Sequence, residues 1–276
     1  MIVLPNVIPH EKLRVQEIPS DIERLLIYSV LQRGLKLFRE DEFICRIPKE
    51  RERDYSVLHM SSIGHCGRKE FLRLKDTQTF DDLEQILRNR IPPPYLPWHM
   101  GHIIETYTLH ILKLGGLPPF DMQRKVSDLD RKITGSIDGL VKIGTTNYLI
   151  EIKGLRHESV DLLLSYGVKK AIPAYYAQMQ YYMYCLKVNA GYFLALDKDT
   201  NQWYIEYVRF DGYHISFLQQ KVLALHSLQN IEDIPKEYVI YECRFCPLLE
   251  KCFNLEGEEQ FLKNFTAYEE QRRVNN

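Results

Sequence analysis

The chain of 276 residues lacks several features that would assign it to a class at once. It has no apolar run as long as the roughly 20 residues that a helix needs to cross a bilayer, so no membrane contact is expected. Its first residues carry neither a basic segment nor the cleavage site of a secretory signal, so the expected location is the cytoplasm, or the host cytoplasm for a viral protein. It has no Gly-x₄-Gly-Lys-Ser/Thr motif, which excludes a P-loop ATPase within the chain.

The sequence also lacks an excess of charge of either sign. Its 36 lysines and arginines and 37 acidic residues give a formal net charge of −1, which neither favours nor excludes nucleic acid as a partner. Local basic pairs such as Arg68-Lys69, Arg124-Lys125 and Lys169-Lys170 are candidate contacts for an anion, although any single pair is typical of a solvated surface. An apolar fraction of 45% is that of a soluble globular protein.

The order of apolar patterns predicts an α/β fold with a mixed central sheet flanked by helices. Helices are expected at 20–38, 68–75, 81–90, 98–114, 158–166, 173–187 and 213–228. Strands are expected at 122–128, 132–143, 147–153, 190–196 and 202–209.

Two of these strands place carboxylates and an amine at one end of the sheet. Asp138 lies at or near the end of the first strand, and the polar turn Gly144–Asn147 folds the chain into a hairpin. Side chains alternate along a strand, so Glu151 and Lys153 point one way while the isoleucines beside them point into a core. Carboxylates select Mg²⁺ or Mn²⁺, and a lysine beside the metal orients or deprotonates a water. The arrangement indicates metal-assisted phosphodiester hydrolysis, and an ordinary hairpin with exposed charges is the alternative.

The cysteines predict a metal cluster rather than disulfides, which are unexpected without a secretory signal. They are Cys45, Cys66, Cys185, Cys243, Cys246 and Cys252. The last three have the spacing Cys-x₂-Cys-x₅-Cys, which lets their thiolates reach one metal, and no local histidine completes the set. Cys66 is the best candidate for a distal fourth ligand, followed by Cys45 and then Cys185. A distal cysteine fits an iron–sulfur cluster better than zinc, and the spacing is compatible with either.

The motifs around these residues resemble the PD-(D/E)XK nuclease superfamily. The resemblance rests on Asp138, on Glu151-Ile-Lys153 and on the segment Pro173–Met183, which looks like the corresponding helix of RecB-like and lambda-type exonucleases. One cysteine upstream and three downstream of these motifs resemble the iron–sulfur branch, which includes the CRISPR-associated exonucleases and the nuclease domain of the AddB subunit. The resemblance spans residues 56–255.

The resemblance implies a metal-dependent DNA exonuclease with a restriction-endonuclease-like core. The implied catalytic residues are Asp138, Glu151, Lys153 and Gln178. The implied ligands of Mg²⁺ or Mn²⁺ are Glu105, Asp138, Glu151 and the backbone carbonyl of Ile152. A structural [4Fe-4S] cluster would be held by Cys66, Cys243, Cys246 and Cys252. In this scheme 1–55 is an accessory helical segment, and the cluster joins the N- and C-terminal ends of a nuclease domain at 56–276.

The glutamine helix leaves one choice to be made. Gln178 and Gln180 diverge by about 200° around a helix and cannot both face the sheet. The family motif favours Gln178, with Tyr182 one turn further on.

The implied partner is DNA, as single- or double-stranded ends, in end processing, recombination, repair or phage DNA metabolism. A homo-oligomer and a helicase or recombinase partner are compatible with the family. The alternatives that stay open are an end-trimming nuclease subunit for CRISPR adaptation, a non-catalytic nucleic-acid-binding scaffold, and a zinc-ribbon interaction module.

Overall fold

The computed structural model describes residues 21–40, 43–45, 56–75 and 95–235, together with Cys243 and Cys246. The helix expected at 81–90 and the third clustered cysteine, Cys252, lie outside these residues. Within the described ranges, no helix is long and apolar enough to cross a membrane.

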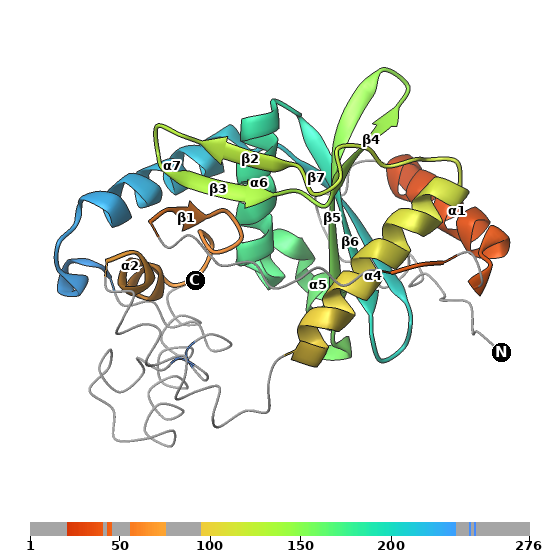
Figure 1. The fold of residues 1–276 in the computed structure, drawn as a ribbon, viewed down its shortest axis with the longest axis horizontal. Helices are drawn as coiled ribbons and strands as arrows, with labels where there is room; N and C mark the ends of the chain where they lie inside the picture. Colours follow the sequence, from red (N-terminus) through yellow and green to blue (C-terminus); the bar gives the residue numbers. More distant parts are fainter. Residues whose placement is uncertain are drawn as a thin grey trace.

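A four-stranded mixed sheet lies at the centre of the fold (Figure 1). Its order is β4 (Gly139–Ile143), β5 (Thr146–Leu155), β6 (Ala190–Asp197) and β7 (Trp203–Arg209). β4 and β7 are each antiparallel to their neighbours, whereas β5 and β6 run parallel. Parallel neighbours need a crossover, which α5 (His157–Ala171) and α6 (Pro173–Leu186) provide. The predicted mixed sheet with flanking helices is confirmed.

The strand expected at 132–143 is in fact two strands in two sheets. β3 (Ile133–Ser136) pairs parallel with β1 (Leu58–His59) and antiparallel with β2 (Lys125–Asp128). The chain then passes through Ile137 and Asp138 into β4 of the central sheet. The expectation of one continuous strand was wrong because both pieces bury apolar side chains, so the hydrophobic pattern runs unbroken through the change of sheet.

Helices cover both faces of the central sheet (Figure 1). On one face, α1 (Asp21–Leu37) and α4 (Tyr95–Leu114) share an apolar cluster with Ile150, Ile152 and Trp203. On the other face, α5, α6 and α7 (Gly212–Ser227) share a second cluster that includes Leu149 and Phe193. The isoleucines beside Glu151 therefore point into a core, as the strand alternation predicts.

Two glycines set the crossing of α1 and α4. A Cβ at Gly34 would lie 2.0 Å from the carbonyl oxygen of Ile111, and one at Gly115 would lie 2.1 Å from the carbonyl oxygen of Val30. Both distances are far inside van der Waals contact, so only glycine permits this approach of the two backbones. α1 also reaches the sheet, because Arg24 Nε donates to the carbonyl of Ile205 in β7 at 3.0 Å.

α1 is thus part of the core that carries α4. The prediction of an accessory segment at 1–55 also covers residues 1–20 and 46–55, which lie outside the described part of the chain.

Another helix, α2 (Gly67–Lys75), packs against α7 and a short 3₁₀ helix, η3 (Ile231–Asp233). Arg68 Nε donates to the carbonyl of Ile234 at 2.8 Å. Lys221 Nζ donates to the carbonyl of His65 at 2.7 Å. These contacts hold the segment around Cys66 against the last described helices of the chain.

Candidate active site

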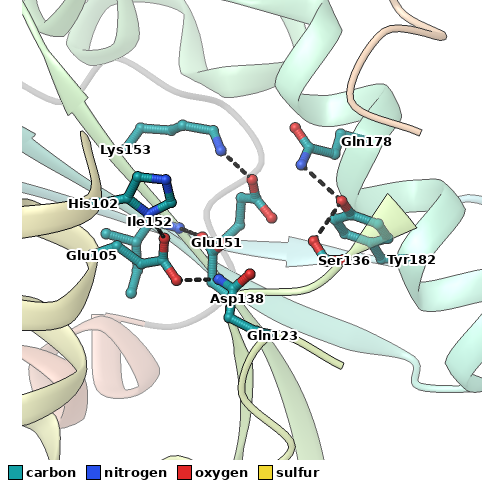
Figure 2. A network of polar contacts seen from close by, with 10 residues as sticks. All are labelled: His102, Glu105, Gln123, Ser136, Asp138, Glu151, Ile152, Lys153, Gln178 and Tyr182. Atoms are coloured by element: carbon teal, nitrogen blue, oxygen red, sulfur yellow. Dashed lines mark hydrogen bonds and ion pairs between the residues drawn. The ribbon is translucent and has the colours of Figure 1, made fainter. Parts of the chain in front are cut away.

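Asp138 and Glu151 lie together where β4 begins beside β5 (Figure 2). Gly139 pairs with Ile150 in the antiparallel ladder, so the register brings residue 138 opposite Glu151. Asp138 Oδ2 accepts a hydrogen bond from the backbone amide of Ile152 at 2.7 Å. Asp138 is 9% exposed and Glu151 is fully buried. The break between β3 and β4 therefore serves to place one buried carboxylate next to another.

Lys153 lies on the same side of β5 as Glu151, and its Nζ donates to Glu151 Oε1 at 2.5 Å. The amine also lies 5.1 Å from the centre of the Tyr175 ring in α6. Burial lowers the pKa of Lys153, but the negative charges of Glu151 and Asp138 raise it by more, so the net shift is upward. In this arrangement Lys153 is a protonated hydrogen-bond donor.

Glu105 brings a third carboxylate to the site from α4 (Figure 2). Its Oε1 accepts a short hydrogen bond from the side-chain amide of Gln123, and its Oε2 lies 3.7 Å from His102 Nδ1. Burial, together with the charge of Asp138, raises the pKa of Glu105 to about 7. Glu105 is therefore electrostatically coupled to the hairpin, although it comes from a separate element.

The three carboxylates share one lysine, and the imbalance shows in their pKa values. Burial raises the pKa of Glu151 to about 8, with Lys153 opposing the shift and Asp138 adding to it. Burial also raises the pKa of Asp138, although Lys153 and the amide of Ile152 oppose the shift. Glu151 Oε2 is buried and has no hydrogen-bond partner among the residues that the structure describes. An unpaired buried carboxylate oxygen among like charges suits a hard divalent cation, so these residues fit Mg²⁺ or Mn²⁺.

The carboxylates do not form a finished coordination shell. In the described ranges no group of three or more His, Cys, Asp or Glu side chains is already arranged to hold a metal ion. One oxygen of Glu151 is instead engaged by Lys153, and one oxygen of Asp138 by the main chain. The assignment of Glu105, Asp138, Glu151 and the Ile152 carbonyl as metal ligands stays a prediction.

The two glutamines of α6 point in different directions. Gln180 is fully buried, and its Nε2 donates to the carbonyl of Arg209 at 2.8 Å. Its Oε1 accepts from the amide of Asp211 at 2.7 Å. Gln180 thus fastens the end of β7 to α6 and is occupied by the main chain.

Gln178 is the glutamine on the side of the carboxylates (Figure 2). Its Nε2 donates to the hydroxyl of Tyr182 at 3.1 Å, and that hydroxyl donates to the carbonyl of Ser136 at 2.8 Å. Ser136 ends β3, two residues before Asp138, so the pair connects α6 to the chain that carries the first carboxylate. The structure favours Gln178 over Gln180 as the residue near the site, and its catalytic role stays a prediction.

Sequence reasoning missed Gln123, which is the residue in contact with Glu105. Gln123 lies in an irregular connection between α4 and β2, where no periodic pattern identifies a functional side chain. The strand predicted at 122–128 includes Gln123, whereas β2 begins at Lys125, and a polar residue within a predicted strand is too common to be informative.

The cysteines are described only in part. Cys66 and Cys243 are buried, at 8% and 5% exposed, and the amide of Cys246 donates to the carbonyl of Cys243 at 3.0 Å. Cys66 directly precedes α2, whose Arg68 holds Ile234. A cluster that joins these segments is not shown, and the iron–sulfur ligand set stays a prediction.

Comparison with known proteins bears on the fold. No family model matches the sequence, and no curated protein matches it. The crystal structure of SSO0001 is similar with a TM-score of 0.50 and 16% identity, over 85% of this chain and 97% of that chain. At this identity the likeness shows a shared fold.

Two exonuclease structures are similar over a smaller part of the chain. The alkaline exonuclease LHK-Exo from Laribacter hongkongensis has a TM-score of 0.43 and 18% identity, over 63% of this chain and 87% of that chain. A phage-related exonuclease from Haemophilus somnus 129PT has a TM-score of 0.40 and 16% identity, over 61% of this chain and 91% of that chain.

Proposed function

We propose that this protein is a metal-dependent DNA exonuclease that hydrolyses phosphodiester bonds at Asp138, Glu151 and Lys153. The observation that carries the proposal is the proximity of two buried carboxylates to a lysine, where one carboxylate oxygen has no hydrogen-bond partner in the described part of the chain. Such a set holds a divalent cation and presents an ammonium to the same substrate. DNA ends as substrate are supported by the resemblance of the helix Pro173–Met183 to that of exonucleases.

The residues divide the chemistry among them. Glu105, Asp138, Glu151 and the carbonyl of Ile152 would hold Mg²⁺ or Mn²⁺. A divalent ion held by these residues would supply Lewis-acid chemistry, lowering the pKa of a water and polarising the scissile phosphate.

Lys153, held protonated by its acidic neighbours, orients the attacking water or a phosphate oxygen by its charge. The ring of Tyr175 beside the amine limits the directions in which it moves. Gln178, held by Tyr182, orients Lys153 or the phosphate.

Digestion of end-labelled single- and double-stranded DNA by anaerobically purified protein tests the proposal. Cleavage is expected with Mg²⁺ or Mn²⁺ and not with EDTA, and Lys153→Met should lower the rate by about 10²–10⁴-fold. Lys142→Met is the matched control, since Lys142 is an exposed lysine of β4. DNA binding without cleavage under any metal would overturn the enzyme and support the scaffold alternative.

We further propose that Cys66, Cys243, Cys246 and Cys252 hold a structural [4Fe-4S] cluster. The support is the burial of Cys66 and Cys243 and the contacts that hold the Cys66 segment against α7 and Ile234. Iron and sulfide analysis of anaerobic protein should give both elements, and Cys66→Ser should lose them while Cys185→Ser retains them. Zinc without sulfide, or iron retained in Cys66→Ser, would contradict this ligand set.

A further inference from the structure

The turn 120–124 is fastened to the chain on both sides of Asp138. Phe120 and Leu140 exchange two backbone hydrogen bonds, of 2.8 and 2.9 Å. The amide of Ile137 donates to the carbonyl of Arg124 at 3.1 Å. The turn therefore takes its position from the residue before Asp138 and from the second residue after it.

The backbone of this turn is held in an unfavourable conformation. Asp121 and Gln123 have φ values of 52° and 56°, in the left-handed region that residues with a Cβ rarely adopt. Asp121 Oδ2 pairs with Arg124 Nη1 at 2.7 Å, which closes the turn from outside. Such conformations persist where the surrounding structure imposes them, and they gather at functional sites.

The side chain of Gln123 reaches from this turn to α4. Its Nε2 donates to Glu105 Oε1, and Figure 2 shows it crossing from beside Asp138 to the third carboxylate. An amide NH₂ group only donates, so it selects one carboxylate oxygen and fixes the plane of the carboxylate. The other oxygen, Oε2, lies toward His102.

We propose that Gln123 is a positioning residue that sets Glu105 for cation binding. Asp138 takes its position from the main chain of Ile152, and Glu105 takes its position from Gln123. The turn is anchored on both sides of Asp138, and α4 packs on the face of the central sheet that carries Ile150 and Ile152. Gln123 therefore links the position of the hairpin to that of Glu105 in α4. The inference rests on the proposed metal-dependent nuclease, and it assigns to the turn the alignment of its metal ligands.

Removing the side chain without disturbing the backbone tests this role. Gln123→Gly keeps the left-handed turn, which glycine adopts without strain, and lacks the amide. Calorimetric titration of the DNA-free protein with Mn²⁺ should show affinity about 10–100-fold weaker than that of the wild type. The thermal midpoint in EDTA should be unchanged or higher, which separates a positioning role from a structural one.

Asp121→Gly is the matched control. It relieves the same kind of backbone strain in the same turn, and the residue it replaces pairs with Arg124 rather than with Glu105. Its Mn²⁺ affinity should stay within about twofold of the wild-type value, well inside the effect of losing an outer-shell partner.

The outcomes separate the positioning role from the proposed function. Wild-type affinity in Gln123→Gly would overturn the positioning role and leave the nuclease intact. Equal weakening in both glycine variants would assign the effect to the rigidity of the turn and would also overturn it. Failure of the wild-type protein to bind Mn²⁺ and to cleave DNA would reject the proposed function, and the inference with it.

Discussion

The carboxylate of Asp138 accepts a hydrogen bond of 2.7 Å from the backbone amide of Ile152. This contact joins the start of β4 to the residue between Glu151 and Lys153, so the main chain sets the spacing of the site. Burial raises the pKa values of the three acids, and the charge of Asp138 adds to the upward shift at Glu105 and Glu151. The buried acids therefore carry an electrostatic penalty, which a divalent cation bound as proposed would relieve.

Affinity for a divalent cation should rise steeply with pH. Burial raises the pKa of Glu105 to about 7 and that of Glu151 to about 8, so at pH 6 both carry protons that the cation must displace. Between pH 6 and 7 the dissociation constant for Mn²⁺ should fall by about tenfold for each displaced proton. Titration calorimetry in buffers of different ionisation enthalpy measures the protons released. A pH-independent affinity from 6 to 8 would contradict the coupling.

The stability of the metal-free protein should fall as pH rises. The pKa of Glu151 is raised from 4.5 to about 8 on folding, so between these values the folded state binds more protons than the unfolded state. The stabilisation is fully present below pH 4.5 and is lost as pH rises through the folded pKa. Urea unfolding in EDTA at pH 5.5 and 8 measures the difference, and Glu151→Gln should flatten it. A steeper slope in that variant would assign the pH dependence to other groups.

The two glutamines of α6 should separate in their effects. Gln180→Ala leaves the carbonyl of Arg209 and the amide of Asp211 without their partner, at a cost of about 2–4 kcal/mol in unfolding free energy. Gln178→Ala loses one bond to Tyr182 and should cost about 1 kcal/mol. Urea unfolding and the cleavage assay together test both variants. Relative to its loss of unfolding free energy, Gln178→Ala should lose more cleavage activity than Gln180→Ala. The reverse ranking would place Gln180 at the chemistry.

The close crossing of α1 and α4 should make its glycines irreplaceable. Gly34→Ala and Gly115→Ala each push a methyl group into a backbone carbonyl, which cannot swing aside, and should cost about 1–3 kcal/mol. Gly101→Ala is the control within α4, because no atom of the described residues lies within 4 Å of its added Cβ. It should gain about 0.5–1 kcal/mol from helix propensity. Thermal midpoints that shift alike in all three variants would show that the crossing tolerates a Cβ.

Local patterns were enough to predict the hairpin that carries the candidate site. The two-residue period of a strand placed Glu151 and Lys153 on one side and their isoleucine neighbours in a core, and the polar turn Gly144–Asn147 gave the antiparallel pairing. These features are local, and the physical cause acts within a few residues. The sequence therefore predicted β5 and its antiparallel pairing with the preceding strand, although not that β4 begins only at Gly139.

Features that depend on contacts between residues distant in the sequence could not be predicted from local patterns. β1 is two residues long and forms because Leu58 pairs with Ile133, so it is too short for a periodic pattern to predict it. The end of β3 before Asp138 is a change of sheet between two apolar segments. Gln123 contacts Glu105 because its backbone is left-handed and α4 lies within reach of its side chain, and no local sequence pattern predicts either property.

The packing of α1 on α4 limits how the protein can be shortened. Ile27 and Leu31 are fully buried against the same cluster that holds Ile111 and Trp203. A fragment beginning at residue 56 would keep the whole hairpin and both glutamines, yet it would present the bared apolar side of α4 and β7 to water. Such a fragment is expected to aggregate, so a shortened chain that still folds has to retain the helix Asp21–Leu37.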